Sequence, residues 1–184
     1  MANLLIKDSQ RLTYELMATT DADLLWQLDQ DSEVMRYING GKKTSKSDID
    51  DIMLPRMDKY RDAENGWGIW KVCRKSDRIF LGWVLVRPMH FFTEARSDDN
   101  LELGWRFHQK YWGNGYATEA AKAVMQALSQ QKGITTFSAI ADKENHASIN
   151  IMKKIGMTFL KRDLFIDPLI NEVVDYYSIQ DYSG

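Results

Sequence analysis

Apolar residues along this chain recur with two periods, every second residue in some segments and every third or fourth residue in others. The first period is typical of strands and the second of amphipathic helices. Strand-like segments occur at 12–16, 67–72, 79–86, 101–107, 134–140, 157–160 and 173–179. Helical segments are expected at 22–28, after Asp21 as N-cap, and at 47–64, 117–132 and 147–155.

The order of these segments predicts the fold class. Strands outnumber helices, and a hairpin of two strands around the turn 75–77 precedes a strand–helix–strand unit at 101–140. This order predicts an α/β protein with a mixed central sheet. No repeat, linker or low-complexity segment interrupts residues 1–184, so we expect a single domain. The segment from Pro88 to Asn100 is expected to be a long loop, either a binding or lid element or a solvated excursion.

Composition excludes several classes of protein. The net charge of −2 and the pI near 5.9 argue against a nucleic-acid-binding surface. No apolar segment approaches the roughly 20 residues of a membrane span, so we expect no membrane association and a cytoplasmic setting. Cys73 is the single cysteine and is expected to be a small core residue. The histidines at 90, 108 and 146 lie too far apart for metal-ligand spacing, and no metal site is expected.

The glycine-containing run YWGNGYA at 111–117 is the strongest functional feature of the chain. Gly113 and Gly115 permit a tight turn and leave backbone N–H groups accessible, and the helix that follows favours an anion such as a pyrophosphate. Many glycine turns, however, only change the direction of the chain. Two nucleotide motifs are excluded: no Lys-Ser or Lys-Thr pair follows Gly115, and Thr118 stands where the dinucleotide fingerprint needs a third small residue.

Three motifs in order carry a resemblance to a known family. They are YWGNGYATEA at 111–120, NHAS at 145–148 and KKIGM at 153–157, and together they resemble the GNAT superfamily of acetyl-CoA-dependent N-acetyltransferases. The likeness is greatest to the RimJ/RimL type, which acetylates the α-amino group of ribosomal proteins, and it covers about residues 11–180. It implies a mixed sheet of about seven strands, splayed between the fourth and fifth, with about four flanking helices.

The resemblance also implies where acetyl-CoA, the expected co-substrate, would bind. The backbone of 113–118 would hold the pyrophosphate, and the end of the fourth strand would pair with the pantetheine amides. Asn145 resembles a residue whose side-chain amide touches the cofactor arm, and it also suits the cap of the next helix. The expected cofactor-binding residues are Trp105, Phe107, Lys110, Trp112, Gly113, Asn114, Gly115, Tyr116, Ala117, Thr118, Asn145 and Ser148.

Two positions depart from the family pattern. Lys110 stands where Gln or Arg is frequent, which keeps the charge of Arg but loses its planar fork. Met152 stands where many members carry a Tyr that protonates the departing thiolate. The leaving thiol should have a pKa near about 8.5, and general acids contribute only about 10²–10⁴-fold, so a hydrogen bond from Ser148 or water could suffice. Alternatively, the Ser148 hydroxyl only satisfies a local backbone group.

Glu102 is the candidate carboxylate for accepting the proton of the amine through a water molecule. Strand alternation puts Glu102, Gly104 and Arg106 on one face of the strand. The alternative to a catalytic role is therefore that Glu102 only forms an ion pair with Arg106. A peptide α-amine has a pKa of about 7.7–8.0, against about 10.4 for lysine, so a site without a strong base suits an α-amine.

We therefore expect acetyl-CoA and an amine as partners, with a protein N-terminus as the preferred acceptor. Small amines (a polyamine, an amino sugar or an amino acid) and a non-catalytic acetyl-CoA-binding module are the alternatives. A monomer and a homodimer are both compatible with the sequence.

Overall fold

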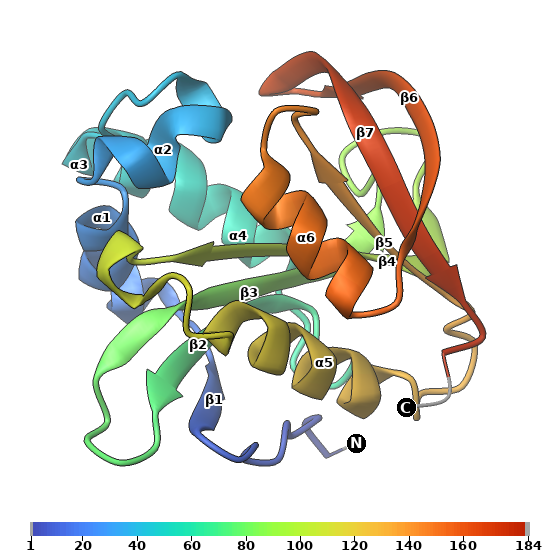
Figure 1. Ribbon diagram of the computed structural model, residues 1–184, viewed down its shortest axis with the longest axis horizontal. Helices are drawn as coiled ribbons and strands as arrows, with labels where there is room; N and C mark the ends of the chain where they lie inside the picture. Colours follow the sequence, from blue (N-terminus) through green and yellow to red (C-terminus); the bar gives the residue numbers. More distant parts are fainter. Residues whose placement is uncertain (1, 183–184) are drawn as a thin grey trace.

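A seven-stranded mixed sheet forms the centre of the computed structural model, which describes residues 2–182 (Figure 1). The strand order is β1-β2-β3-β4-β5-β7-β6; β4 and β5 are parallel, and every other neighbouring pair is antiparallel. This arrangement confirms the expected mixed central sheet. The strands are β1 (Leu12–Leu16), β2 (Gly68–Arg74), β3 (Phe80–Met89), β4 (Ser97–Phe107), β5 (Thr136–Ala141), β6 (Thr158–Asp167) and β7 (Ile170–Gln180).

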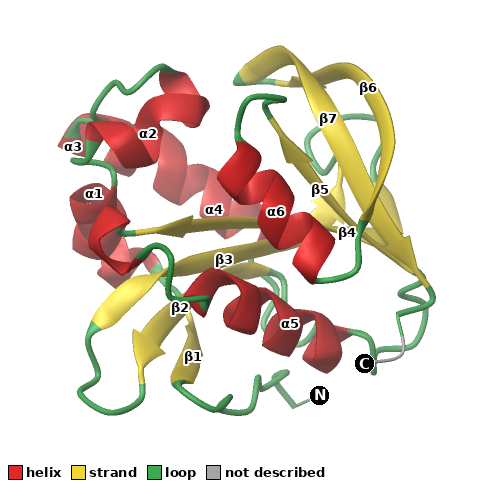
Figure 2. Ribbon diagram, in the orientation of Figure 1, coloured by secondary structure: helices red, strands yellow, loops and turns green. Residues whose placement is uncertain are grey.

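Helices cover both faces of the sheet. Figure 2 shows α5 (Tyr116–Leu128) and α6 (His146–Lys154) in front of the sheet and α4 (Leu54–Tyr60) behind it. The side behind also carries α1 (Ala22–Leu28) and α2 (Ser32–Asn39). The α5 face is the face of the sheet that packs on α5 and α6, and the α4 face is the opposite one. Short helical segments complete the chain: η1 (Thr19–Asp21), α3 (Lys46–Asp48), the π-helix η2 (Ile49–Met53) and η3 (Gln109–Tyr111).

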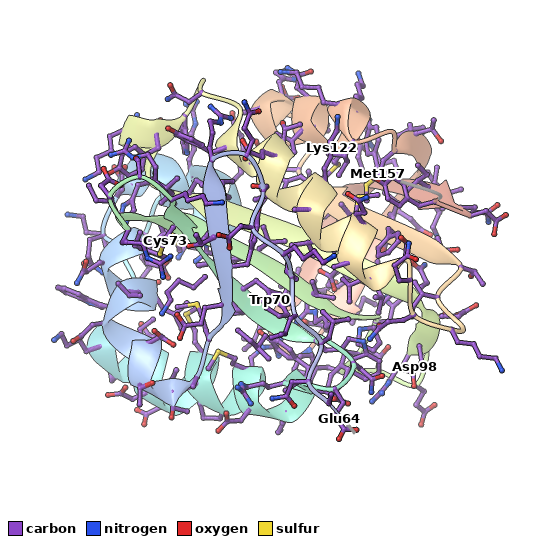
Figure 3. All side chains as sticks on the ribbon, turned by 90° about the horizontal axis from the view of Figure 1, so that it is seen from below. Glu64, Trp70, Cys73, Asp98, Lys122 and Met157 are labelled. Carbon is purple, nitrogen blue, oxygen red and sulfur yellow. The ribbon has the colours of Figure 1, made fainter. Side chains whose placement is uncertain are left out.

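The larger core lies between α5 and the sheet. Buried alanines at 120 and 121 let α5 approach the strands closely, and Val124, Met125 and Leu128 continue the apolar stripe at helical spacing. Figure 3 shows the side chains that fill this region, with Trp70 labelled within the cluster. A second cluster lies on the α4 face, where α1, η2 and α4 pack on β2 and β3.

The first half of the chain departs from the helix predictions in several details. The helix expected at 47–64 forms over residues 46–60, where α3, the π-helical turn η2 and α4 follow one another without a break, and it ends four residues early, after Tyr60. Asp62 then holds a turn by accepting hydrogen bonds from following backbone N–H groups. Asp21 occupies the N-cap position of α1, but its side chain accepts the N–H of Ala18 instead. The α2 helix, capped by the Asp31 side chain, was not predicted.

Other boundaries also differ from the predictions. The expected loop from Pro88 to Asn100 is shorter, because β3 extends to Met89 and β4 already begins at Ser97. The helix of the strand–helix–strand unit, α5, ends at Leu128 rather than at 132. The strands β6 and β7 are longer than the expected segments 157–160 and 173–179 and form a long hairpin. Cys73 is half-buried rather than a core residue, and burial raises the pKa of its thiol.

The sheet opens between β4 and β5. These strands pair only where Asn100, Leu101 and Glu102 face 136–138 of β5. The C-terminal part of β4, residues 103–107, has no strand partner on this side. This divergence confirms the expected splay, and it leaves a row of backbone groups on β4 able to pair with something other than a strand of the sheet.

Candidate active site

The turn between β4 and α5 is shaped for an anion. Gly113 and Gly115 both have a φ of 76°, a left-handed conformation that residues with a side chain rarely adopt. A Cβ atom added at Gly113 would meet nothing within 4 Å. Among residues 2–182, none accepts a hydrogen bond from the backbone N–H groups of 113–118, and the N-cap Gly115 provides no side-chain cap. These unpaired N–H groups lie at the positive end of the α5 helix dipole, and both features favour binding of a phosphate group there.

Arg11, from the segment just before β1, anchors this turn. Its Nη1 donates to the carbonyl of Asn114 at 2.9 Å, and its Nε donates to Oε2 of Glu119 at 2.7 Å. Its guanidinium also lies 4.5 Å from the ring centroid of Tyr116. The hydroxyl of Ser9 donates to the other carboxylate oxygen of Glu119 at 2.7 Å. Burial by itself would raise the pKa of Glu119, but the hydrogen bonds from Ser9 and Arg11 outweigh it and lower that pKa.

Side chains of the turn stabilise its shape. The Asn114 amide donates to the carbonyls of Tyr111 and Trp112, both at 3.0 Å. The indole of Trp112 is 46% exposed, and its Nε1 donates to the carbonyl of Phe107 at 2.8 Å. Lys110 is exposed on η3 and lies 5.0 Å from the ring of Tyr111. The main chain, rather than these side chains, therefore provides most of the donors for an anion.

The open edge of β4 continues from this turn. Trp105 lies in the unpaired segment, and its buried Nε1 has no hydrogen-bond partner among the described residues. A buried donor without a partner is unfavourable, so a ligand carbonyl at this position would be stabilising. The side chain of Phe107 packs in the core, which leaves only its backbone for a ligand.

The start of α6 brings Asn145 and Ser148 together. Oδ1 of Asn145 accepts the backbone N–H of Ser148 at 3.2 Å, which makes Asn145 the helix cap. The Asn145 amide nitrogen and the half-buried Ser148 hydroxyl make no hydrogen bond with another described residue. Both groups are thus available to a ligand. Met152, one turn further, is 1% exposed and packs in the core.

Glu102 pairs with Arg87, so the predicted partner Arg106 was wrong. The two residues face each other in the β3–β4 register, and Arg87 donates from Nε to Oε2 at 2.8 Å and from Nη2 to Oε1 at 3.2 Å. Arg106 pairs with Asp29 at 2.5 Å instead. The reason is geometric, because cross-strand neighbours lie about 5 Å apart, whereas residues two positions apart on one strand lie about 7 Å apart.

Every buried carboxylate among residues 2–182 has an arginine partner. The pairs are Asp29–Arg106, Glu102–Arg87, Asp167–Arg56 and Asp175–Arg162. The first three pairs join residues of β3, β4, α4, the end of α1 and the end of β6 on the α4 face, and among the described residues this face therefore carries no buried unpaired carboxylate. Tyr60 lies close by, with its ring 5.6 Å from the Arg87 guanidinium, and burial raises its pKa to about 12.

No cluster of three or more metal-ligating side chains occurs in the described part of the chain. Likewise, none of its helices is both long and apolar enough to cross a membrane.

Comparisons with known proteins agree with this geometry. A family model for an acetyltransferase (GNAT) domain matches residues 11–158. The chain is 28% identical over 176 residues to the N-acetyltransferase YnaD of Bacillus subtilis (strain 168), a match that covers 93% of this chain and 94% of YnaD.

Two solved structures have the same fold. An acetyltransferase of the GNAT family from Bacillus anthracis superposes with a TM-score of 0.70 at 23% identity, covering 94% of this chain and 96% of the other. RimL, a ribosomal alpha-N-protein acetyltransferase solved with coenzyme A, also gives a TM-score of 0.70, at 13% identity, covering 96% and 97%. At these identities, the likeness establishes the fold alone.

Proposed function

The chain belongs to the GNAT acetyltransferase family, and from this premise we propose that it acetylates protein N-terminal α-amines in the manner of the RimJ/RimL type. As a member of this family it is an N-acetyltransferase that uses acetyl-CoA as co-substrate. The acceptor, the residues that bind the cofactor and those that assist the reaction are the proposal.

The free N–H groups of 113–118 would hold the diphosphate of acetyl-CoA. Six consecutive N–H groups without a protein acceptor, two left-handed glycines and a helix N-terminus all favour this assignment. Lys110, Trp112, Tyr116 and Thr118 would border the phosphates, and Arg11 would keep the turn in shape. In this proposal the diphosphate is bound mainly by backbone N–H groups, which most side-chain substitutions leave in place.

The pantetheine arm would lie along 103–107 of β4 as an added strand does. Trp105 would donate its unpaired indole N–H to an amide carbonyl of the arm, and the Asn145 amide nitrogen would reach the arm from the opposite side of the splay. This placement brings the thioester close to the free backbone edge of β4.

The reaction would be direct transfer. The amine nitrogen attacks the thioester carbonyl carbon, a C–N bond forms, and the C–S bond breaks as the thiolate of CoA leaves. Backbone N–H groups on the open edge of β4 would stabilise the oxyanion of the tetrahedral intermediate. The Ser148 hydroxyl would donate a hydrogen bond to the departing sulfur, because Met152 has no proton to give and lies in the core.

Glu102 would receive the proton of the amine through a water molecule. Each oxygen of its carboxylate accepts one hydrogen bond from Arg87 and retains a second lone pair for a water. An α-amine, with a pKa of about 7.7–8.0, needs little help to lose its proton at neutral pH.

The observation that supports an α-amine as acceptor is that each buried carboxylate of residues 2–182 is paired with an arginine. A polyamine or an aminoglycoside keeps further ammonium groups that must be neutralised inside the site, and within residues 2–182 the α4 face offers no buried unpaired carboxylate for them. A peptide N-terminus has a single amine, and the rest of its backbone is neutral.

A thiol-release assay with acetyl-CoA tests this proposal. Three acceptors should be compared. The first is a short lysine-free peptide with a free N-terminus, the second is a peptide whose N-terminus is blocked by acetylation and whose only amine is one lysine side chain, and the third is spermidine. We expect release only with the first. Turnover with spermidine but not with the free peptide would contradict the α-amine preference. Tight acetyl-CoA binding in calorimetry, without release for any amine, would indicate a non-catalytic binding module.

A further inference from the structure

Gly104 lies in the middle of a central strand without a packing reason to be glycine. A Cβ added there would touch only Leu85, whose Cβ and Cδ2 would both lie 3.5 Å away, and this is an ordinary van der Waals contact. Its φ is not positive. At Gly82, by contrast, a Cβ would collide with the Arg106 carbonyl and the Phe107 backbone, so packing explains that glycine.

A glycine inside a strand weakens it, and it often marks a position where a ligand approaches the backbone closely. Gly104 fits this description. It lies in the segment of β4 that has no partner on the β5 side. It is partly exposed, although its neighbours Glu102 and Leu103 are buried.

Two ion pairs flank this glycine on the α4 face. Glu102–Arg87 lies two residues before it and Arg106–Asp29 lies two residues after it. All three β4 residues project toward the same face, about 7 Å apart, because strand side chains alternate. The α5 face of the same segment is occupied by Leu103, Phe107 and the helix. Between the two ion pairs, Gly104 is therefore the position on the α4 face of the open strand edge at which no side chain stands.

We infer that Gly104 is the opening through which the acceptor amine reaches the thioester, and that its missing side chain determines how bulky an acceptor the enzyme takes. This inference rests on the proposed function, since it requires the thioester to lie along the open edge of β4. A methyl group at residue 104 would stand in the path of attack without disturbing the diphosphate site. Small amines would still pass, whereas the chain that follows a peptide α-amine would collide with the added group.

The test compares Gly104→Ala and Gly104→Val with the wild type. We expect kcat/KM for a peptide N-terminus to fall about 10-fold or more with alanine and further with valine, since one methyl group in a substrate pocket changes specificity by about 10–200-fold. The loss with methylamine should be clearly smaller than the loss with the peptide. Acetyl-CoA affinity by calorimetry should stay within about twofold, because the added Cβ projects from the α4 face, whereas the backbone groups of 103–107 that are proposed to pair with the pantetheine arm lie in the plane of the sheet and are retained. Leu85→Ala is the matched control, because it alters the packing neighbour of Gly104 without adding bulk, and it should retain peptide selectivity.

Each outcome has one meaning. Full peptide activity in both Gly104 variants overturns the inference and leaves the proposed acetylation intact. Equal losses for methylamine and for the peptide also overturn it, because blocking should discriminate by size. An inactive wild type, tested with every amine, refutes the proposed function itself. If Gly104→Val does not fold, Gly104→Ala decides, because its Cβ makes only ordinary contacts.

Discussion

The substitution Gly115→Val tests the diphosphate site directly. Gly115 has a φ of 76°, and an added Cβ would contact only Nη2 of Arg11, at 3.6 Å. The protein can accommodate the new atoms, so the cost to folding is mainly backbone strain. A residue with a side chain in this conformation costs about 1–2 kcal/mol. For a chain of this length, that corresponds to a fall in melting temperature of about 2–8 °C.

The effect on the cofactor should be much larger. The valine methyl groups would occupy the space in front of the N–H groups of 113–118, where the phosphate oxygens are proposed to lie. Hydrogen bonds to charged groups contribute about 1.5–3 kcal/mol each. Loss of two such bonds would weaken acetyl-CoA binding by about 3–6 kcal/mol, or roughly 10²–10⁴-fold.

Calorimetry with CoA and with pantetheine separates this effect from general damage. Binding of CoA should fall steeply in the variant, and binding of pantetheine, which lacks the diphosphate, should change little. Gly133→Val is the matched control, because Gly133 has a φ of 97° and nothing within 4 Å of an added Cβ, but lies beyond the other end of α5. It should lower the melting temperature without affecting CoA. Unchanged CoA affinity in Gly115→Val would refute the assignment of the turn.

Three further predictions address other parts of the site. Ser148→Ala should lower kcat about 10-fold with little change in the KM for acetyl-CoA, and an unchanged kcat in steady-state assays would exclude its role at the sulfur. Glu119→Gln should lower the free energy of unfolding by about 1 kcal/mol at pH 7. Because folding lowers the pKa of Glu119, this difference between variant and wild type in denaturant titrations should vanish as the pH falls through the folded pKa. A difference that persists at low pH would contradict the ionic contribution. Arg56→Met should lower the free energy of urea unfolding by about 3–5 kcal/mol, because it leaves the buried carboxylate of Asp167 unpaired. Adding Asp167→Asn should recover part of this loss, and no recovery would show that the unpaired charge is not its cause.

Local patterns were sufficient to predict the elements that build the proposed cofactor site. Alternation predicted β4 and the facing of Glu102, and the two glycines predicted the turn before α5. These features depend on the sequence within a few residues, because strand facing follows a period of two and a left-handed turn requires glycine. The short α2 helix had recognisable signals as well, with Asp31 before it and Gly40 after it.

Contacts between distant segments could not be predicted from such patterns. The pairing of Glu102 with Arg87 depends on the register of β3 and β4. The pairing of Arg106 with Asp29 depends on where α1 docks, 77 positions away in the chain. The π-helical turn between α3 and α4 has no simple sequence signal either, since its residues continue an ordinary helical pattern.

The anchoring of the turn at 113–118, the proposed phosphate site, by Arg11 and Ser9 has a consequence for how the protein folds. The bonded partners are 103 to 110 positions apart, so a nascent chain cannot acquire a working turn until α5 has been synthesised and has met the start of the chain. Trimming the chain up to Arg11, by a protease or in a shortened expression clone, would leave all seven strands but would remove the core residue Ile6. It would also free the carbonyl of Asn114 from Arg11 and so weaken the proposed phosphate site, although this segment contributes no group to the proposed chemistry.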